Sequence, residues 1–291
     1  MTITAKDVAA LRARTGAGMG DCKKALEEAG GNIESAIDIL RKKGIAKAEK
    51  RAGRAAAEGQ IVTSVSDDAT IGAVIELNCE TDFVARNDEF GALVAQVAQH
   101  IAADTSLNGV AELTPESPLL AKPWHFDKSQ TLGEVVKAAA AKTGENVTLR
   151  RVARYATTGA VGFYRHFNGK IAVLVDISGA TGEPARTLAA TVAEHVAAGV
   201  PVVPVGVRKE DVPADVLERE KAIYVAQAKE SGKPDAIVEK MVQGRVDKYF
   251  KEVTLLEQPW VRDPEKTINQ VVAGTPGASV VRFVRFQMGE A

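Results

Sequence analysis

Three carboxylates that lie close together in the sequence offer the best arrangement for acid-base chemistry in this chain. Glu76, Glu80 and Asp82 fall within one short stretch, and two carboxylates held in different protonation states can act as general acid and general base. No histidine lies nearby to serve as a base, and the chain has only 4 histidines. An enzyme that uses two of these carboxylates therefore remains one interpretation, and a non-catalytic protein is favoured.

Other catalytic and cofactor motifs are missing from the sequence. There is no G-x-x-x-x-G-K-[ST] loop, so the chain is not expected to hold a nucleotide itself, and no G-x-S-x-G or H-E-x-x-H motif suggests a hydrolase. The segment 16–20 (GAGMG) resembles a dinucleotide fingerprint only superficially, because a helix pattern precedes it where a strand is required. Cys22 and Cys79 are far apart and have no C-x-x-C partner, which indicates reduced structural thiols. We expect no chemical step, no cofactor and no bound metal.

Phe83 is the most informative single residue. It lies in segment 78–88 (NCETDFVARND), an otherwise polar connection between an apolar strand pattern and a helix pattern. A large apolar ring in such a connection indicates a side chain that enters a partner. The alternative is a hydrophobic staple, in which Phe83 folds back onto the next helix and Thr81 or Asp82 caps that helix.

An internal repeat provides a comparison for this connection. The strand pattern at 73–78 (AVIELN) resembles that at 173–178 (VLVDIS), with an acidic residue at the equivalent position. The helix patterns at 93–103 and 188–198 are identical at seven of eleven positions. Between strand and helix, however, the second copy has a plain turn at 179–184 (GATGEP). The chain is therefore predicted to contain two copies of one sheet-plus-helix unit, and the aromatic connection of the first copy is not needed for folding alone.

The overall composition is balanced. The chain has 291 residues, with 37 Lys plus Arg against 38 Asp plus Glu and a formal net charge of -1. No global field directs it to nucleic acid or to an anionic membrane. The N-terminus lacks an apolar signal core, and no stretch approaches the ~20 apolar residues that a membrane span needs. We expect a cytoplasmic protein of two or three domains.

The first region, residues 1–54, is predicted to form three short helices followed by a basic linker. The expected helix caps are Thr4, Asp21 and Asn32, and the expected helix ends are Gly16, Gly30-Gly31 and Gly44. Met19 is expected in the glycine-rich turn between the first two helices, where it forms either a pliable contact surface together with Arg12 or an ordinary core edge.

Segment 41–54 carries seven basic residues and one acidic residue. A charge run of this size is more often a solvated helix than a nucleic-acid site, and no aromatic residue is interleaved with it. RNA contact is therefore not expected, although a non-catalytic adaptor or an RNA-binding protein that uses this segment is the chief alternative.

The remaining chain is predicted to form two core units. The first, 55–145, has expected strands at 59–65 and 71–78 and expected helices at 88–103 and 132–143. The second, 146–291, has expected strands at 148–153, 160–167, 170–177 and 280–286 and an expected helix at 184–199. Within it, 212–251 is predicted to be an antiparallel helical hairpin turning at 231–234, and the alternative is that both helices lie flat on the core.

The histidines point to structural roles. His100 and His195 occupy the same place in the two repeated helices, which favours a shared structural function. His125 lies in a Pro-containing excursion without evident partners. His166 lies at a strand edge before the Asn168-Gly169 turn, where a surface contact and a core or turn role are both open.

Two long stretches resemble the signatures of the bacterial translation elongation factor Ts family. They are 11–26 (LRARTGAGMGDCKKAL) and 80–87 (ETDFVARN), and shorter matches occur at 144–146, 231–234, 255–259 and 282–286. The resemblance runs from end to end. It implies an α+β protein with a ubiquitin-associated-like N-terminal module, two similar core subdomains and a protruding helical hairpin.

The resemblance also implies a function. Members of this family exchange guanine nucleotide on elongation factor Tu, the GTPase that carries aminoacyl-tRNA to the ribosome. Asp82 and Phe83 match the positions that dock beside the nucleotide site of that GTPase and dislodge its magnesium ion, and Thr81 and Val84 match positions that shape the docking loop. The other positions that match partner contacts are Arg12, Met19 and His166.

Overall fold

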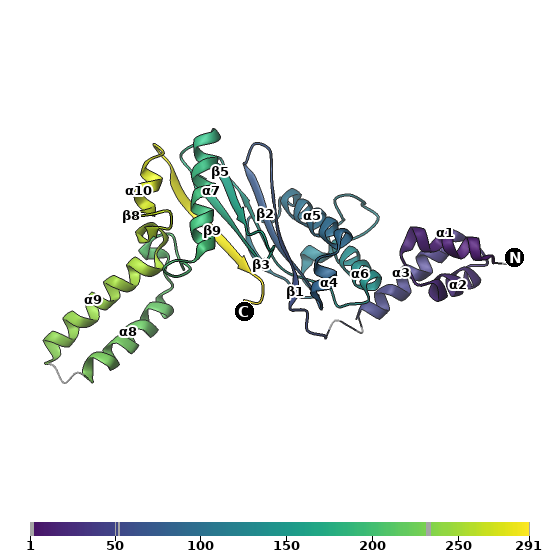
Figure 1. Ribbon diagram of the computed structural model, residues 1–291, viewed down its shortest axis with the longest axis horizontal. Helices are drawn as coiled ribbons and strands as arrows, with labels where there is room; N and C mark the ends of the chain where they lie inside the picture. The colour runs from purple at the N-terminus through teal and green to yellow at the C-terminus, as the bar shows by residue number, and fades with distance from the viewer. Residues whose placement is uncertain (1–2, 50, 52, 231–233, 291) are drawn as a thin grey trace.

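The computed structural model describes residues 3–49, 51, 53–230 and 234–290. Its central part is built in four layers, in which two antiparallel sheets pack face to face and helices cover their outer faces (Figure 1). Three further helices lie at the N-terminal end of the molecule, and a pair of long helices projects from the opposite end. Among the described residues, no helix is both long enough and apolar enough to cross a membrane.

The first sheet has the strand order β1-β2-β4-β3. Its members are β1 (Glu58–Val65), β2 (Ile71–Cys79), β3 (Gly109–Glu112) and β4 (Thr148–Ala156). Side chains alternate along β2: Ile75 and Leu77 face the outer helices, and Val74 faces the second sheet. The outer helices are α5 (Asp88–Ala103) and α6 (Leu132–Thr143).

The second sheet has the strand order β5-β6-β9. Its members are β5 (Ala160–Arg165), β6 (Ile171–Ser178) and β9 (Ser279–Gln287), and its outer face is covered by α7 (Gly182–Ala198) and α10 (Ile268–Ala273). Val173 and Val175 of β6 pack under these helices, whereas Leu174 points into the core between the sheets. Because the central strands are buried on both faces, they are apolar over almost their whole length.

One strand was assigned to the wrong unit. The sequence interpretation expected 148–153 to open the second unit, but β4 pairs antiparallel with β2 along its length and also with β3, so it belongs to the first sheet. A single sequence does not reveal the pairing with β2, because the paired residues are at least 70 positions apart and only packing selects them. The expected final strand is confirmed as β9, which pairs with β6.

The N-terminal helices are α1 (Ala5–Thr15), α2 (Met19–Glu28) and α3 (Ile33–Glu49). Thr4 caps α1 and Asn32 accepts a hydrogen bond at the start of α3, as predicted. Asp21 does not cap α2, which begins two residues earlier with Gly18 at its cap, so Met19 is the first helical residue and not part of a turn. A small core that includes Leu11 of α1, Leu26 of α2 and Ala36 of α3 joins the three helices.

The third helix does not end at Gly44 but continues to Glu49. Gly44 marks a close approach instead: a Cβ there would lie 2.9 Å from the Cβ of Ala141 on α6. An ion pair of 2.9 Å between Arg41 and Glu134 also joins these two helices. The N-terminal helices are therefore attached to the first core unit through the packing of α3 against α6.

The long helices at the opposite end are α8 (Ala214–Lys229) and α9 (Asp235–Val253), which contact one another and lie side by side away from the sheets (Figure 1). Ala228, Val238 and Val246 are buried between or beneath them, whereas Ile223 and Ile237 stay exposed. Of the expected turn at 231–234, residues 231–233 lie outside the described residues. The remaining short elements are α4 (Asp82–Ala85), η1 (Pro118–Ala121), η2 (Lys209–Asp211), η3 (Leu255–Glu257), β7 (Pro259–Trp260) and β8 (Asp263–Thr267).

Candidate protein-binding site

The connection between β2 and α5 contains one turn of helix, α4, and Phe83 is its second residue. The Phe83 side chain is 84 % exposed. The staple alternative is therefore wrong, because the ring does not fold back onto the following helix. Asn87 caps α5 with its side-chain oxygen, and Thr81 caps α4.

The neighbours of Phe83 attach α4 to the first sheet. Ala85 is buried in the core under α5 and α6, and Val84 is partly buried against the same core. Gln60 of β1 donates from Nε2 to the carbonyl oxygen of Ala85 at 2.5 Å. Asp82 faces solvent and pairs with Arg86 at 3.1 Å. The turn thus presents one large apolar ring beside one carboxylate.

The equivalent connection in the second unit has no such feature. After β6, Gly179 leads within a few residues to α7, and Thr181 stands at the cap of α7 without a side-chain hydrogen bond. Both units place a helix on the outer face of their sheet, so the scaffold folds without the aromatic turn. This comparison favours a binding role for Phe83.

The three carboxylates that could have formed a catalytic pair point to different partners. Glu76 is fully buried between the sheets and bound to Arg151. Glu80 accepts a hydrogen bond from the backbone N–H of Asn146, and Asp82 lies at the surface. The structure does not bring any two of them together, so it gives no support to acid-base catalysis at this place.

His100 and His195 fill matching structural positions, as predicted. The Nδ1 atom of His100 accepts the backbone N–H of His125 at 3.1 Å, and that of His195 accepts the N–H of Val261 at 3.3 Å. Burial lowers the pKa of both rings, that of His100 to about 4. Each neutral ring therefore fixes a loop against its helix. His125, expected to have no partners, contributes this backbone bond and an edge contact to Phe126.

Arg12 and Met19 lie on the N-terminal helices, at the end of the molecule in Figure 1 that is remote from α8 and α9. Arg12 is exposed in the last turn of α1, and Met19 is 44 % exposed at the start of α2. An exposed methionine can adapt to the shape of a partner. The structure keeps these residues apart from α4, so they would form a second, separate contact.

His166 follows β5. Its Nδ1 atom lies 3.1 Å from the Tyr164 hydroxyl oxygen, which is within hydrogen-bonding distance. The ring of the next residue, Phe167, packs against it with centroids 4.5 Å apart. Phe167 is 93 % exposed and was missed by the sequence interpretation. The available signal was a second aromatic residue in a polar turn, directly before Asn168-Gly169.

The basic segment is largely occupied by contacts within the chain. Among its described side chains, those with acidic or carbonyl partners are Arg41, Lys43, Arg51 and Arg54. Such contacts hold the segment against α2, α6 and the start of α4, which supports a structural linker over an RNA site.

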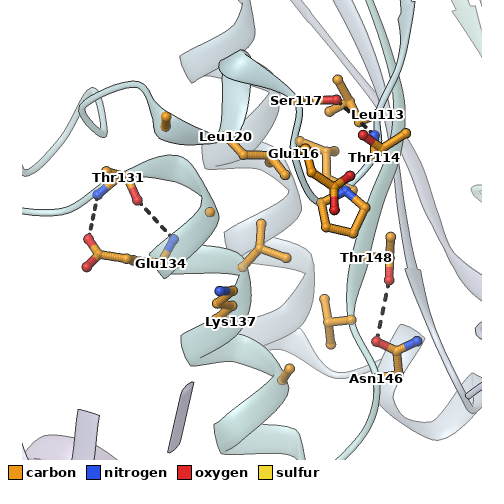
Figure 2. A pocket seen from close by; sticks show the side chains of 17 residues that line it. Leu113, Thr114, Glu116, Ser117, Leu120, Thr131, Glu134, Lys137, Asn146 and Thr148 are labelled. Carbon is orange, nitrogen blue, oxygen red and sulfur yellow. Dashed lines mark hydrogen bonds between the residues drawn. The ribbon is translucent and has the colours of Figure 1, made fainter. Parts of the chain in front are cut away.

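A cavity of about 470 Å³ lies between α6, the 113–121 segment and the start of β4 (Figure 2). It was not expected from the sequence. Its polar side chains serve local structure: Thr131 and Glu134 form the capping box of α6, and the Thr148 hydroxyl donates to Asn146 at 3.4 Å. The cavity therefore resembles a packing defect beneath a loop more than a ligand site with converging polar groups.

An α+β scaffold that exposes an aromatic turn, whose candidate catalytic carboxylates point to different partners and whose two buried histidines make structural contacts, is typical of a protein that acts by binding another protein. A family model described as Elongation factor TS matches residues 80–290. The chain is 47 % identical over 292 residues to elongation factor Ts of Thioalkalivibrio sulfidiphilus, covering 100 % of this chain and 93 % of the relative.

Other relatives agree. The chain is 46 % identical to elongation factor Ts of Clostridium botulinum strain Eklund 17B, covering 99 % of this chain and 93 % of the relative. It is 44 % identical to elongation factor Ts of Aquifex aeolicus, covering 99 % of both. The chain belongs to the elongation factor Ts family, which confirms the resemblance found in the sequence.

Proposed function

We propose that this protein is a guanine nucleotide exchange factor for elongation factor Tu, and that it carries out no chemical step of its own. The family membership supports the partner and the place in protein synthesis. The observation that carries the mechanism is the exposed Phe83 ring on an anchored turn. Such a ring gains free energy only when a partner covers it.

The physical basis of exchange is linkage between two binding events. A GTPase holds GDP through backbone amides, a lysine and a magnesium ion that bridges the phosphates. Insertion of the Asp82-Phe83 pair beside that site dislodges the magnesium ion and weakens GDP binding. By thermodynamic reciprocity, bound nucleotide weakens the binding of the exchange factor by the same ratio. Binding of GTP can therefore complete the cycle by releasing the exchange factor.

The expected size of the effect is sufficient. A well-covered aromatic anchor contributes about 2 to 4 kcal/mol, which corresponds to roughly 30- to 1000-fold in an equilibrium constant. Thr81 caps the turn and Val84 packs beneath it, so both shape the docking surface. In this proposal Arg12 and Met19 form an additional contact, and His166 with its exposed neighbour Phe167 a third.

The proposal assigns a part to each region. Residues 1–54 form a ubiquitin-associated-like module with its linker, the core subdomain that carries the aromatic turn follows from residue 55, and the second subdomain includes the helical hairpin 212–251. The pairing of β4 with β2 moves strand 148–156 into the first subdomain. The boundary that best fits the pairing is then near Thr157.

A nucleotide-release assay tests this function. The purified chain is mixed with elongation factor Tu carrying fluorescent GDP, and the release rate is followed by stopped flow with excess unlabelled nucleotide. We expect release to accelerate with the concentration of the chain. If the full chain binds neither the GDP form nor the nucleotide-free form and leaves the release rate unchanged, the proposal is wrong.

A further inference from the structure

Glu145 makes three hydrogen bonds to the two residues that precede α4. Its Oε2 atom accepts the backbone N–H groups of Glu80 and Thr81, each at 3.0 Å, and its Oε1 atom accepts the Thr81 hydroxyl at 2.6 Å. Glu145 stands directly after Gly144, the left-handed residue that ends α6. A carboxylate from one helix end therefore holds the beginning of another helix.

The contact is reciprocal. Glu80 accepts the backbone N–H of Asn146 at 2.6 Å through its own Oε1 atom. Two segments more than sixty residues apart thus each place a carboxylate on the backbone of the other. We refer to Glu80, Thr81, Glu145 and Asn146 as the carboxylate clasp. Charge-assisted bonds of this kind are stronger than neutral ones, so the clasp fixes both segments.

Thr81 is the residue that the clasp immobilises most completely. Its hydroxyl oxygen also accepts the N–H of Val84 at 3.4 Å, and its carbonyl oxygen accepts the thiol of Cys79 at 3.2 Å. Burial, reinforced by the charge of Glu145, raises the pKa of the Cys79 thiol to about 11. The thiol therefore stays protonated and remains a donor. The backbone N–H, the carbonyl and the hydroxyl of Thr81 are all occupied.

The helical turn itself cannot supply this rigidity. A helix of 4 residues has no stability of its own, and Phe83, which faces solvent, gains little from packing within the chain. The direction of the ring is set by what holds the two ends of the turn. The carboxylate clasp holds the first end, and the buried Ala85 with its bond to Gln60 holds the second.

We propose that Glu145 is a positioning residue for nucleotide exchange: it holds Thr81 so that Phe83 meets the partner in one fixed direction. This inference rests on the proposed exchange function. Glu145 does not itself touch the nucleotide site. It acts through preorganisation, because a turn that is already ordered loses less entropy when the partner covers it.

A double-mutant cycle tests the proposal. The variants are Glu145→Ala, Phe83→Ala and the combination of both, measured in the stopped-flow release assay at saturating factor. We expect Glu145→Ala to slow GDP release by about tenfold, since several bonds to a charged group are lost. The double variant should be no slower than Phe83→Ala alone, within about twofold, because Glu145 acts only through the ring.

Two further measurements separate positioning from a general folding defect. Amide hydrogen exchange of residues 80–86 in the free protein should become faster in Glu145→Ala, whereas the amides of β6 and α7 should not change. Glu145→Gln keeps the volume and one acceptor oxygen, so it should restore part of the release rate. Glu116→Ala, which removes an exposed carboxylate from the same half of the molecule, is the matched control and should behave as wild type.

The outcomes distinguish the two proposals. Wild-type release rates in both Glu145 variants, or losses that multiply in the double variant, would overturn the positioning role while leaving exchange intact. If the wild-type chain fails to accelerate release, the exchange function fails instead. Hydrogen exchange still decides, without the partner, whether Glu145 orders the turn: unchanged protection of residues 80–86 in Glu145→Ala contradicts the proposal.

Discussion

Glu76 of β2 and Asp176 of β6 occupy equivalent positions in the two sheets, and both point into the core between them. Glu76 accepts the Nε–H of Arg151 at 2.6 Å, and the guanidinium of Arg151 lies 4.5 Å from the centre of the Phe286 ring on the opposite sheet. The acidic residue thus orients an arginine that crosses from one sheet to the other.

The second unit repeats this arrangement in the opposite direction. Asp176 accepts the Nε–H of Arg282 at 3.0 Å, and the guanidinium of Arg282 lies 4.1 Å from the centre of the Tyr155 ring on the first sheet. Each sheet therefore supplies one acid-arginine pair and one aromatic ring to the other. The repeat in the sequence preserves a two-way connection between the units as well as a strand and a helix.

Removal of one acid from this connection should destabilise the protein strongly. In Glu76→Ala the buried Arg151 loses its carboxylate, and we expect the free energy of unfolding to fall by about 3 to 5 kcal/mol. Urea unfolding followed by circular dichroism measures the change. The control is Asp215→Ala, which breaks an exposed pair with Arg219 and should cost less than about 1 kcal/mol. Equal small losses would show that the buried pair is not needed for stability.

The sequence was sufficient to predict most elements but not how they associate. The expected helix 132–143 agrees with α6, in which the structure shows a capping box at Thr131 and a left-handed end at Gly144. The membership of β4 in the first sheet was not predictable, since strand pairing over long separations depends on packing that no local pattern records. The helix end predicted at Gly44 was wrong for a related reason. Gly44 permits the close approach of α3 to α6, and the helix continues beyond it.

The sequence likewise predicted the exposed residue of the candidate site but not the residues that hold it in place. Exposure of Phe83 could be inferred because the second unit supplies the same scaffold without an aromatic turn. The part played by Glu145 could not, because its hydrogen-bond partners are more than sixty residues away and become visible only in three dimensions. A resemblance to a family identifies positions that touch a partner, but not the residues that hold those positions in place.

Truncation of the exposed ring should separate function from stability. Phe83→Ala removes a side chain that makes little contact within the chain, so the free energy of unfolding should change by less than about 0.5 kcal/mol. Release of GDP from the partner should slow by roughly 30- to 1000-fold. Phe126→Ala, at another partly exposed ring, serves as the control and should release GDP at the wild-type rate. Wild-type release by Phe83→Ala would remove the ring from the mechanism.

Substitutions in the N-terminal helices should affect binding more than release. Arg12 and Met19 are exposed at one end of the molecule, away from the aromatic turn, so Arg12→Ala and Met19→Ala should raise the factor concentration needed for half-maximal release by roughly tenfold. The rate at saturation should stay within about twofold of wild type. The control is Arg14→Ala on the same helix, where the exposed side chain pairs with Glu34. A fall in the GDP release rate at saturating factor, with no change in the factor concentration needed for half-maximal release, would show that these residues act on release and not on binding.

The two cysteines should resist modification while the protein is folded. Cys22 and Cys79 are buried and unpaired, and burial raises the pKa of Cys79 to about 11. Because the thiolate is the reactive form, iodoacetamide at about pH 8 should leave Cys79 unmodified in the folded protein and modify it in denaturant. Mass spectrometry of tryptic peptides measures the extent of reaction at each site. Rapid alkylation of Cys79 in the folded protein would show that the Thr81 segment opens readily.

Stability should fall on acidification partly because of His100. Burial lowers its pKa from 6.5 to about 4, and the nearby Asp104 carboxylate offsets only part of this effect. Since the unfolded chain binds the proton more tightly, the stabilisation is complete above about pH 6.5 and is lost as the pH falls towards about 4. Between about pH 6.5 and 4.5 the loss from this one ring is roughly 2 kcal/mol.

The matched variant is His100→Asn, whose side-chain oxygen can accept the N–H of His125 in place of Nδ1 but does not titrate. Urea unfolding at about pH 6.5 and about pH 4.5 should show a smaller acid-induced loss of the free energy of unfolding in the variant than in wild type. The burial of His195 lowers its pKa in the same direction, so His195→Asn should reduce the loss as well. If wild type and both variants lose the same free energy, other groups account for the acid sensitivity and the buried rings do not contribute through their protonation.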